Sequence, residues 1–279
     1  MGRILIIGHS NELADAFRRE AALHAHEIET CEGAVEALQR LQSRAVDVVV
    51  TDPETSVRED LALCALLRER RPGVRIIALA PAVSPDAVIA ALRAHVFACF
   101  ARPFEIREIA DMVSAALRAD QWSDGIEVVS GAPHWLTLRV SCRLLTADRL
   151  VRFMTELQAG VVDDDRERDL LMTAFREVLL NAMEHGGGFD PEQVIEVTAA
   201  RTARAIVYHF RDPGLGFDQA ALAHATGSSE PEAVIATAIH RAETGLRPGG
   251  FGMLIVRQVV DEVTYNERGN EVLLIKHLS

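Results

Sequence analysis

Lysine is almost missing from this chain of 279 residues, because Lys276 is the only one and the remaining Lys/Arg positions are all arginine. This scarcity excludes a Walker-A phosphate loop, whose lysine follows a glycine-rich turn, and the strand lysine of eukaryotic-type protein kinases. A Schiff-base lysine could only be Lys276. A chain of this composition that uses ATP must therefore use another kind of site.

Long apolar runs and patterned cysteines are also missing. No apolar run approaches the about 20 residues of a membrane span, and the short apolar start at 4–7 lacks the small-residue cleavage site of a signal peptide. The cysteines show no metal-ligand spacing and are expected to be reduced core thiols; they are Cys31, Cys64, Cys99 and Cys142. We therefore expect a cytoplasmic protein with no membrane partner.

Positive charge is in deficit, with 29 Lys and Arg against 41 Asp and Glu and a net charge of −12. A protein that binds duplex nucleic acid needs a basic face to displace counterions, so we expect no nucleic-acid partner. Hydrophobic residues make up 49% of the chain and charged residues 25%, a balance typical of globular proteins. At about 150 residues per domain, the length predicts about two domains.

The first segment, 1–119, alternates between apolar runs typical of buried parallel strands and amphipathic helical patterns. This alternation predicts βαβ units and a doubly wound α/β sheet. Strands are expected at 3–7, 46–51, 75–79 and 97–101, with a weaker one near 26–30, and helices at 11–22, 33–43, 60–70, 85–94 and 105–119. We interpret 120–131 as a linker, because it is first polar and then apolar and carries two glycines.

The second predicted domain, 132–279, mixes strands and helices. Strands are expected at 135–142, 194–199, 205–211, 262–266 and 271–277, and helices at 147–157, 166–184 and 252–261. Thr146 is expected to cap the first of these helices. The acidic cluster at 163–165 favours a helix start, where the helix dipole is positive, over a metal site.

The long predicted helix carries the pattern Glu177-x-x-x-Asn181-x-x-Glu184. Spacings of four and three residues put these side chains along one face of a helix. A carboxylate and an amide on an otherwise buried face are costly unless they bind something. The alternative interpretation is a helix with exposed polar residues and no ligand.

Two glycine motifs follow. In Asp212-x-Gly214-x-Gly216, the aspartate can accept a hydrogen bond from an exocyclic amine, and the glycines let the backbone approach a flat ligand. In the Gly-Gly-Phe-Gly stretch at 249–252, backbone N–H groups at a helix start can bind phosphate. Each motif alone is also typical of an ordinary tight turn or helix start.

Taken in this order, the three motifs resemble those of the Bergerat-fold, or GHKL, ATPases, which include gyrase, the ninety-kilodalton heat-shock chaperones and the histidine kinases. Within that family, the stretches 181–186 and 252–263 look most similar to the anti-sigma factor serine/threonine kinases. The resemblance covers about residues 126 to 279. It implies an α/β-sandwich ATPase fold with ATP and Mg²⁺ as cofactors.

The resemblance also implies roles on the helix side of the site. Asn181 would hold the Mg²⁺ ion that bridges the ATP phosphates. Glu177 would be the catalytic general base, acting on a seryl hydroxyl in a kinase or on water in an ATPase. Residues 217–248 would form the ATP lid. Phosphate charge would be met by Mg²⁺ and helix N–H groups, and by Arg247, which is suggested by its position alone.

Further roles are implied on the loop side. Asp212 would bind the adenine amino group, and Gly214 and Gly216 would shape the adenine pocket. Gly250 and Gly252 would give backbone contacts to phosphate.

The first segment is similar to the receiver domain of response regulators and implies their flavodoxin-like fold. Asp52 ends the third predicted strand, where the phosphoacceptor aspartate of a receiver stands. The run at 97–104 is similar to the last receiver strand and its Lys-Pro turn.

Several receiver positions carry other residues here. The departures are Gly8-His9 for the metal-binding acidic pair, Ala80 for the switch Ser/Thr, Arg102 for the lysine and Cys99 for the switch aromatic. Phosphoryl transfer to an aspartate needs Mg²⁺ to neutralise developing charge. With Asp52 as the sole carboxylate left, we expect a pseudo-receiver that is not phosphorylated by the ordinary route and that docks instead.

These features predict an ATP-binding signalling regulator. The expected activity is that of an anti-sigma-factor-type serine/threonine kinase, which acts by partner switching under control of the receiver-like domain. Expected partners are a sigma factor or an anti-anti-sigma-like antagonist. A homodimer or an interdomain contact is expected through the helix at 105–119.

Two alternatives belong to other classes. One is a non-catalytic interaction module that is gated by nucleotide. The other is a histidine kinase of a two-component system, which needs a phosphoacceptor histidine on paired helices before the ATPase. Only one strand and one helix are predicted between the receiver-like segment and the long helix, and His134 precedes that strand.

Overall fold

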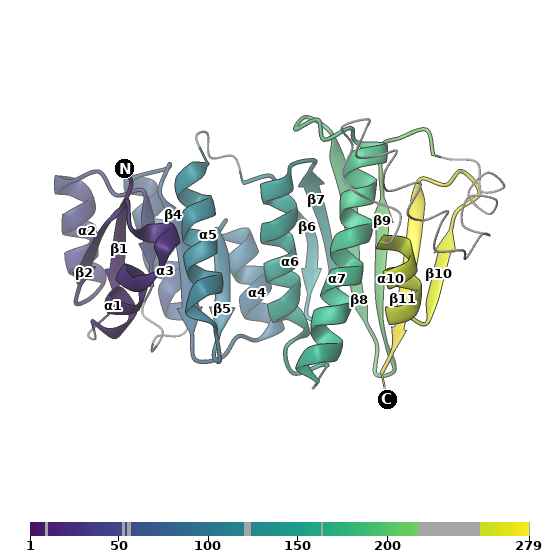
Figure 1. Ribbon diagram of the computed structural model, residues 1–279, viewed down its shortest axis with the longest axis horizontal. Helices are drawn as coiled ribbons and strands as arrows, with labels where there is room; N and C mark the ends of the chain where they lie inside the picture. Colours follow the sequence, from purple (N-terminus) through teal and green to yellow (C-terminus); the bar gives the residue numbers. More distant parts are fainter. Residues whose placement is uncertain are drawn as a thin grey trace. The chain divides into compact units, whose positions relative to one another are not determined.

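The computed structural model describes residues 1–8, 11–51, 54, 57–119, 124–162, 164–216 and 252–278, without the side chains of 58 and 59. The chain divides into two compact units (Figure 1). Unit 1 comprises Met1–Asp124 and Arg152–Ala159, and unit 2 comprises Gly125–Val151 and Gly160–Ser279. The helix α6 (Leu144–Gln158) therefore contributes residues to both units.

Unit 1 is built on a five-stranded parallel sheet with the strand order β2-β1-β3-β4-β5 (Figure 1). Its strands are β1 Arg3–Ile7, β2 Glu27–Cys31, β3 Val48–Val50, β4 Arg75–Ala80 and β5 Ala98–Ala101. Its helices are α1 Glu12–Arg19, α2 Ala34–Ser43, α3 Val57–Arg70, α4 Pro85–Arg93 and α5 Ile106–Arg118. This strand order is that of the flavodoxin-like doubly wound fold and confirms the predicted fold class.

The central strands of unit 1 are apolar on both faces because helices cover the sheet on both sides. Val48–Val50 is completely buried, and so are nearly all residues of β1 and β4. The helix α1 contacts α5, whereas α3 contacts both α2 and α4, which gives the two covering layers. A strand with this composition can only lie inside such a sandwich.

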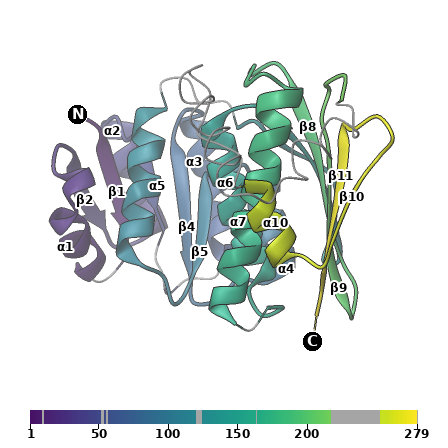
Figure 2. The ribbon, with the colours of Figure 1, turned by 45° about the vertical axis from the view of Figure 1, so that its right-hand side comes forward.

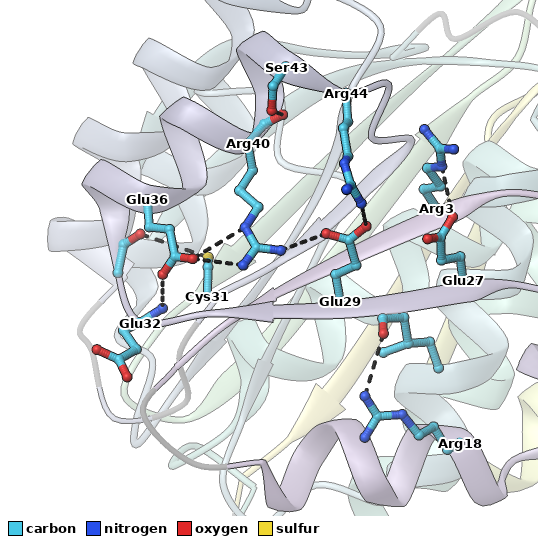
Figure 3. A network of polar contacts seen from close by, with 12 residues as sticks. Arg3, Arg18, Glu27, Glu29, Cys31, Glu32, Glu36, Arg40, Ser43 and Arg44 are labelled. Atoms are coloured by element: carbon cyan, nitrogen blue, oxygen red, sulfur yellow. Dashed lines mark hydrogen bonds and ion pairs between the residues drawn. The ribbon is translucent and has the colours of Figure 1, made fainter.

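The edge strand β2 is charged instead (Figure 3). The Glu29 carboxylate pairs with Arg40 and with Arg44, each at 2.7 Å, and Glu27 pairs with Arg3 at 2.9 Å. Burial raises the pKa of Glu29, but hydrogen bonds and charge from the two arginines outweigh burial and lower the pKa below its usual value. Charged side chains on an edge strand oppose further strand pairing.

Unit 2 is built on a six-stranded sheet with the order β10-β11-β9-β8-β7-β6, in which all neighbouring pairs are antiparallel. The strands are β6 Ile126–Ala132, β7 Trp135–Ser141, β8 Val194–Arg201, β9 Ala205–Arg211, β10 Glu262–Tyr265 and β11 Glu271–His277. The helices α7 Asp165–Asn181 and α10 Gly252–Val259 lie together on one face of this sheet (Figures 1 and 2). The mixed α/β architecture confirms the fold class predicted for this part of the chain.

The core of unit 2 lies between α7 and the central strands. Phe175 of α7 packs its ring against Tyr208 and Phe210 of β9, with centroid distances of 4.9 and 5.0 Å. All three side chains are buried. Alternation of buried and half-exposed residues along β9 turns one face of the strand to the helices.

Local differences from the sequence-based expectations appear at the starts of β6 and α6. β6 occupies part of the range interpreted as a linker, while 120–123 lies outside the described residues and the domain boundaries stay a prediction. The cap expected at Thr146 is wrong, because α6 begins at Leu144 and Thr146 lies within its first turn. Asp164 does cap α7, accepting hydrogen bonds from the backbone N–H groups of Arg166 and Glu167. Asp163 lies outside the described residues.

Among the helices that the structure describes, none combines the length and apolar character that a membrane crossing requires.

Candidate functional site

The end of α7 and the start of α10 form the first part of the candidate site. The two helices pack against each other (Figure 2), with Glu177 and Asn181 one turn apart on α7. A Cβ atom at Gly252, the first residue of α10, would lie 2.3 Å from Oε2 of Glu177. The Glu177 carboxylate therefore lies against the start of α10, and glycine leaves room for it there.

The end of α7 departs from regular α-helix. The residues Ala182–Gly186 form a single π-helical turn, and Gly188 follows with φ +59°. Such π turns often occur at functional sites. This turn brings the backbone that follows Asn181 next to the Asp212 loop.

Asp212 follows β9 and lies against the π turn. A Cβ atom at Gly186 would lie 2.2 Å from Cγ of Asp212, so the carboxyl group packs on the bare backbone of this glycine. The Asp212 side chain also accepts a hydrogen bond of 2.8 Å from the backbone N–H of Gly214 through its Oδ1 atom. The two sequence motifs around Asn181 and Asp212 are thus adjacent in space.

The charge state of Asp212 reflects two opposing influences. Burial of the half-buried carboxyl group raises its pKa. The Gly214 N–H group, and the charges of Arg268 and His185, act in the opposite direction, but the net effect leaves the pKa above its usual value. A carboxylate that is partly shielded from water is a stronger hydrogen-bond partner for a ligand than an exposed one.

Gly216 ends the described part of this loop and has φ +82°. A Cβ atom there would lie 1.9 Å from the carbonyl oxygen of Arg268, in the turn between β10 and β11. Only glycine combines this backbone conformation with such a close approach. The Asp212–Gly216 loop therefore lies between the π turn on one side and the β10–β11 turn on the other.

Cys142 is a neighbour of this loop that sequence patterns do not assign to the site. A Cβ atom at Gly187 would lie 2.3 Å from its Sγ atom. Burial, and then the charges of Asp190 and Asp212, raise the pKa of the Cys142 thiol to about 11. The four cysteines are buried and unpaired, which confirms the prediction of core thiols.

The predicted site residues therefore fall into three groups. The structure brings Glu177 next to Gly252, and Asp212 next to Gly214, with Asn181 one turn beyond Glu177. Gly216 lies on the same loop but faces the β10–β11 turn. Gly250, Arg247 and the predicted lid at 217–248 lie outside the described residues. The ligand roles of all these residues stay predictions.

The receiver-like positions of unit 1 are only partly described. Asp52 and His9 lie outside the described residues. Arg102 forms an ion pair with Glu54, so its guanidinium group has an acidic partner close to the Asp52 position in sequence. Ala80 and Cys99 are completely buried, and burial raises the pKa of the Cys99 thiol.

A buried polar pair next to Asp52 is not evident from the sequence. The Thr51 hydroxyl donates a hydrogen bond of 2.7 Å to Asp60 on α3 and accepts one of 3.0 Å from the backbone N–H of Leu79. Thr51 is fully buried and Asp60 is 5% exposed. The pair ties β3 to α3 and β4, and nothing in the helical pattern of α3 singles out Asp60.

Comparison with known protein families gives two matches along the chain. Residues 4–114 match the family described as "Response regulator receiver domain". Residues 141–276 match the family described as "Histidine kinase-like ATPase domain". The first range falls within unit 1, and the second contains Glu177, Asn181, Asp212 and Gly252.

Individual relatives share about a quarter of their aligned residues with this chain. The chain is 25% identical over 190 residues to the response regulator MprA of Mycobacterium avium (strain 104), which covers 67% of this chain and 81% of that protein. It is 26% identical over 136 residues to MprA of Mycobacterium bovis (strain BCG), covering 49% of this chain and 59% of that protein.

Similar solved structures include receiver domains. One is a CheY-like receiver domain protein from Methanospirillum hungatei JF-1, with 20% identity, a TM-score of 0.38, and coverage of 42% of this chain and 94% of that chain. Another is the receiver domain of the Francisella response regulator 1452, with 18% identity, a TM-score of 0.39, and coverage of 43% and 100%.

Proposed function

We propose that this chain, an ATP-binding signalling regulator in which a receiver domain precedes a histidine kinase-like ATPase domain, is a serine/threonine protein kinase that acts by partner switching. The receiver and ATPase domains support an ATP-binding signalling regulator. The candidate site supports the proposal of a serine/threonine kinase. The proposed phosphoryl acceptor is a seryl or threonyl hydroxyl of a small antagonist protein. The second proposed partner is a sigma factor, which this chain would bind.

The position of the Glu177 carboxylate is the single observation that carries this proposal. It lies against Gly252 at the start of α10, one helical turn from Asn181. The start of a helix presents backbone N–H groups that attract phosphate, and a carboxylate at its edge is placed to accept a proton from an attacking hydroxyl.

The groups around Asp212 support the binding of an adenine nucleotide. The carboxylate accepts a hydrogen bond from the backbone N–H of Gly214 through Oδ1 and packs on the backbone of Gly186, so neither glycine places a side chain beside it. We assign Asp212 to the adenine amino group and Asn181 to the Mg²⁺ ion. Bound Mg-ATP would supply the phosphoryl group and the metal charge that stabilises its transfer.

The only lysine of the chain does not serve this site in the proposal. Lys276, in β11, forms an ion pair of 3.0 Å with Glu167 in the first turn of α7. That turn is the end of α7 opposite to Asn181. Phosphate charge would instead be met by Mg²⁺, by the N–H groups at the start of α10 and by Arg247.

The histidine-kinase alternative lacks a phosphoacceptor on paired helices. Between α5 and α7, the described residues contain β6, β7 and the single helix α6. His134 lies in the turn between β6 and β7, and α6 contains no histidine. The non-catalytic module remains the alternative that an experiment must separate from a kinase.

Transfer of labelled phosphate from Mg-ATP to candidate antagonist proteins separates the two. We expect the wild-type chain to label a seryl or threonyl residue, and Glu177→Gln to bind Mg-ATP with unchanged affinity while transfer falls by about 100-fold or more, the usual effect of a missing general base. Binding without transfer to any partner would favour the nucleotide-gated module. Equal transfer by Glu177→Gln would contradict the role assigned to Glu177.

A further inference from the structure

The turn between β10 and β11 is organised by the side chain of Asn266. Its Oδ1 atom accepts hydrogen bonds from three successive backbone N–H groups, those of Gly269 at 2.8 Å, Asn270 at 3.1 Å and Glu271 at 3.1 Å. This acceptor closes the turn together with two backbone hydrogen bonds, from Gly269 N–H to the Asn266 carbonyl at 3.0 Å and from Asn266 N–H to the Glu271 carbonyl at 3.2 Å. The amide nitrogen of Asn266, Nδ2, takes no part in closing the turn.

That nitrogen continues the network toward the Asp212 loop. Asn266 Nδ2 donates to Oδ1 of Asn270 at 3.0 Å, and Asn270 Nδ2 donates to the backbone carbonyl of Asp212 at 3.2 Å. In the reverse direction, the backbone N–H of Asp212 donates to the carbonyl of Asn270 at 3.0 Å. Both backbone polar groups of Asp212 are thus bound to one residue.

Burial gives this arrangement its rigidity. Asn270 is 7% exposed, so water does not compete freely for its amide group. If the amide rotated by half a turn, its oxygen would face the Asp212 carbonyl oxygen and its nitrogen would face the nitrogen of Asn266. Asn266 therefore selects the orientation in which Asn270 donates to Asp212.

The same turn contacts the loop at a second place. Arg268 Nε donates to the carbonyl of Leu215 at 3.3 Å, and the Arg268 carbonyl lies where a Cβ atom of Gly216 would be. The loop is thus bound by the turn at both of its ends. The carboxylate of Asp212 projects from a backbone that has little freedom.

We propose that Asn270, oriented by Asn266, is a positioning residue that sets the preference of the site for a base with an amino group at the adenine 6-position. The inference rests on the proposed nucleotide site. Because Oδ1 of Asp212 already accepts the Gly214 N–H, we assign Oδ2 to the ligand. A fixed carboxylate attracts a 6-amino group and repels a 6-oxo group, whereas a loosened carboxylate turns away from either.

Inosine triphosphate, which carries an oxo group in place of the amino group, is the probe. Calorimetric titration of the full chain with Mg-ATP and Mg-ITP gives the ratio of the two affinities. We expect the wild type to prefer ATP by about tenfold or more, the usual value of a hydrogen bond to a charged group. Asn270→Ala should reduce this ratio to below about threefold, chiefly by lowering the affinity for ATP. Its affinity for ITP should stay within about threefold of the wild-type value.

Asn266→Asp is the second variant, because it keeps the acceptor that closes the turn and replaces the donor to Asn270 with a charged carboxylate oxygen. It should lower the ATP/ITP ratio in the same direction. Asn11→Ala is the matched control, since Asn11 precedes α1 in unit 1 and makes no side-chain cap hydrogen bond. It should leave both affinities unchanged, and thermal melting verifies that each variant is folded.

The outcomes separate the inference from the proposed function. If both variants keep the wild-type ratio, or if Asn270→Ala weakens ATP and ITP equally, Asn270 is not a positioning residue, while the nucleotide site stands. If the wild type binds neither nucleotide, or binds ITP as tightly as ATP, the assignment of Asp212 to adenine fails and this inference fails with it.

Discussion

Glycines next to two acidic side chains define the candidate site at the residue scale. Gly186 and Gly252 each leave space for a carboxylate, of Asp212 and of Glu177 respectively. Neither needs a left-handed backbone, so packing alone accounts for the missing side chain at both positions.

The first prediction concerns Gly186. In Gly186→Ala, the new Cβ atom would lie 2.2 Å from Cγ of Asp212 and must displace the carboxyl group. We expect ATP affinity to fall by about tenfold or more, because the hydrogen bond to a charged acceptor is lost. Gly73→Ala is the matched control, since a Cβ atom there meets nothing within 4 Å. Equal ATP affinity of the two variants in calorimetry would count against the site.

The second prediction concerns the ionisation of Asp212. Burial raises the pKa of this carboxyl group, so the folded state binds its proton more tightly than the unfolded state does. The ionised group therefore opposes folding above its folded pKa, and this penalty disappears as the pH falls below the ordinary aspartate value of about 3.9. Asp212→Asn should melt at a higher temperature than the wild type at neutral pH, with a gain that vanishes in acid, and should lose ATP binding.

Melting temperatures of both proteins across this pH range test the claim. A variant that is less stable than the wild type at neutral pH would show that the Asp212 charge stabilises the fold.

Some residues of the candidate site can be predicted from the sequence, and others cannot. The spacing from Glu177 to Asn181 and the pattern around Asp212 follow from short-range periodicity, so the sequence places them on a helix and after a strand. Asn266 and Asn270 become visible only once β10, β11 and β9 are paired in register. Asn-x-x-Gly-Asn indicates a turn by itself, but nothing local says which loop that turn contacts.

At the scale of elements, the sequence pattern predicts most strands of both sheets. The predictions that differ from the structure lie at the starts of β6 and α6. The range 120–131 favours a linker over the strand β6 because it is first polar and then apolar and carries two glycines. In the structure, β6 shows a change of register between Val128 and Ser130 against β7. An extra residue of this kind interrupts the simple alternation that identifies a strand.

The third prediction tests the ion pair between β11 and α7. Lys276 is 18% exposed and pairs with Glu167, which is 45% exposed, at 3.0 Å. Because the partner is largely in water, Lys276→Met should lower the free energy of unfolding by less than about 1 kcal/mol. It should leave ATP affinity unchanged within about twofold, since the proposed site uses no lysine. Loss of ATP binding in this variant would assign the lysine to phosphate instead.

At the scale of the whole molecule, the order of elements specified the two folds more clearly than any single motif. The alternating pattern of 1–119 corresponds to the observed β2-β1-β3-β4-β5 sheet, and the Asp212 motif directly follows β9 of the six-stranded sheet. The receiver family match extends over 4–114 although Ala80, Cys99 and Arg102 replace its usual residues. That this domain docks rather than accepts phosphate stays a prediction, since Asp52 lies outside the described residues.

Partner switching, the identity of the antagonist and the homodimer or interdomain contact through α5 also stay predictions. Sequence patterns report which groups a helix or strand presents, and they do not report which protein surface those groups meet. These questions depend first on whether the ATPase domain binds its nucleotide through the residues assigned to it.

Calorimetric titration of Mg-ATP and Mg-ADP into the full chain, beside Asn181→Ala, tests this most directly. We predict saturable binding by the wild type and a loss of about tenfold or more in affinity in the variant, because the amide assigned to Mg²⁺ is gone. Absence of saturable binding by a wild-type protein that melts cooperatively, or equal binding by Asn181→Ala, would contradict the account.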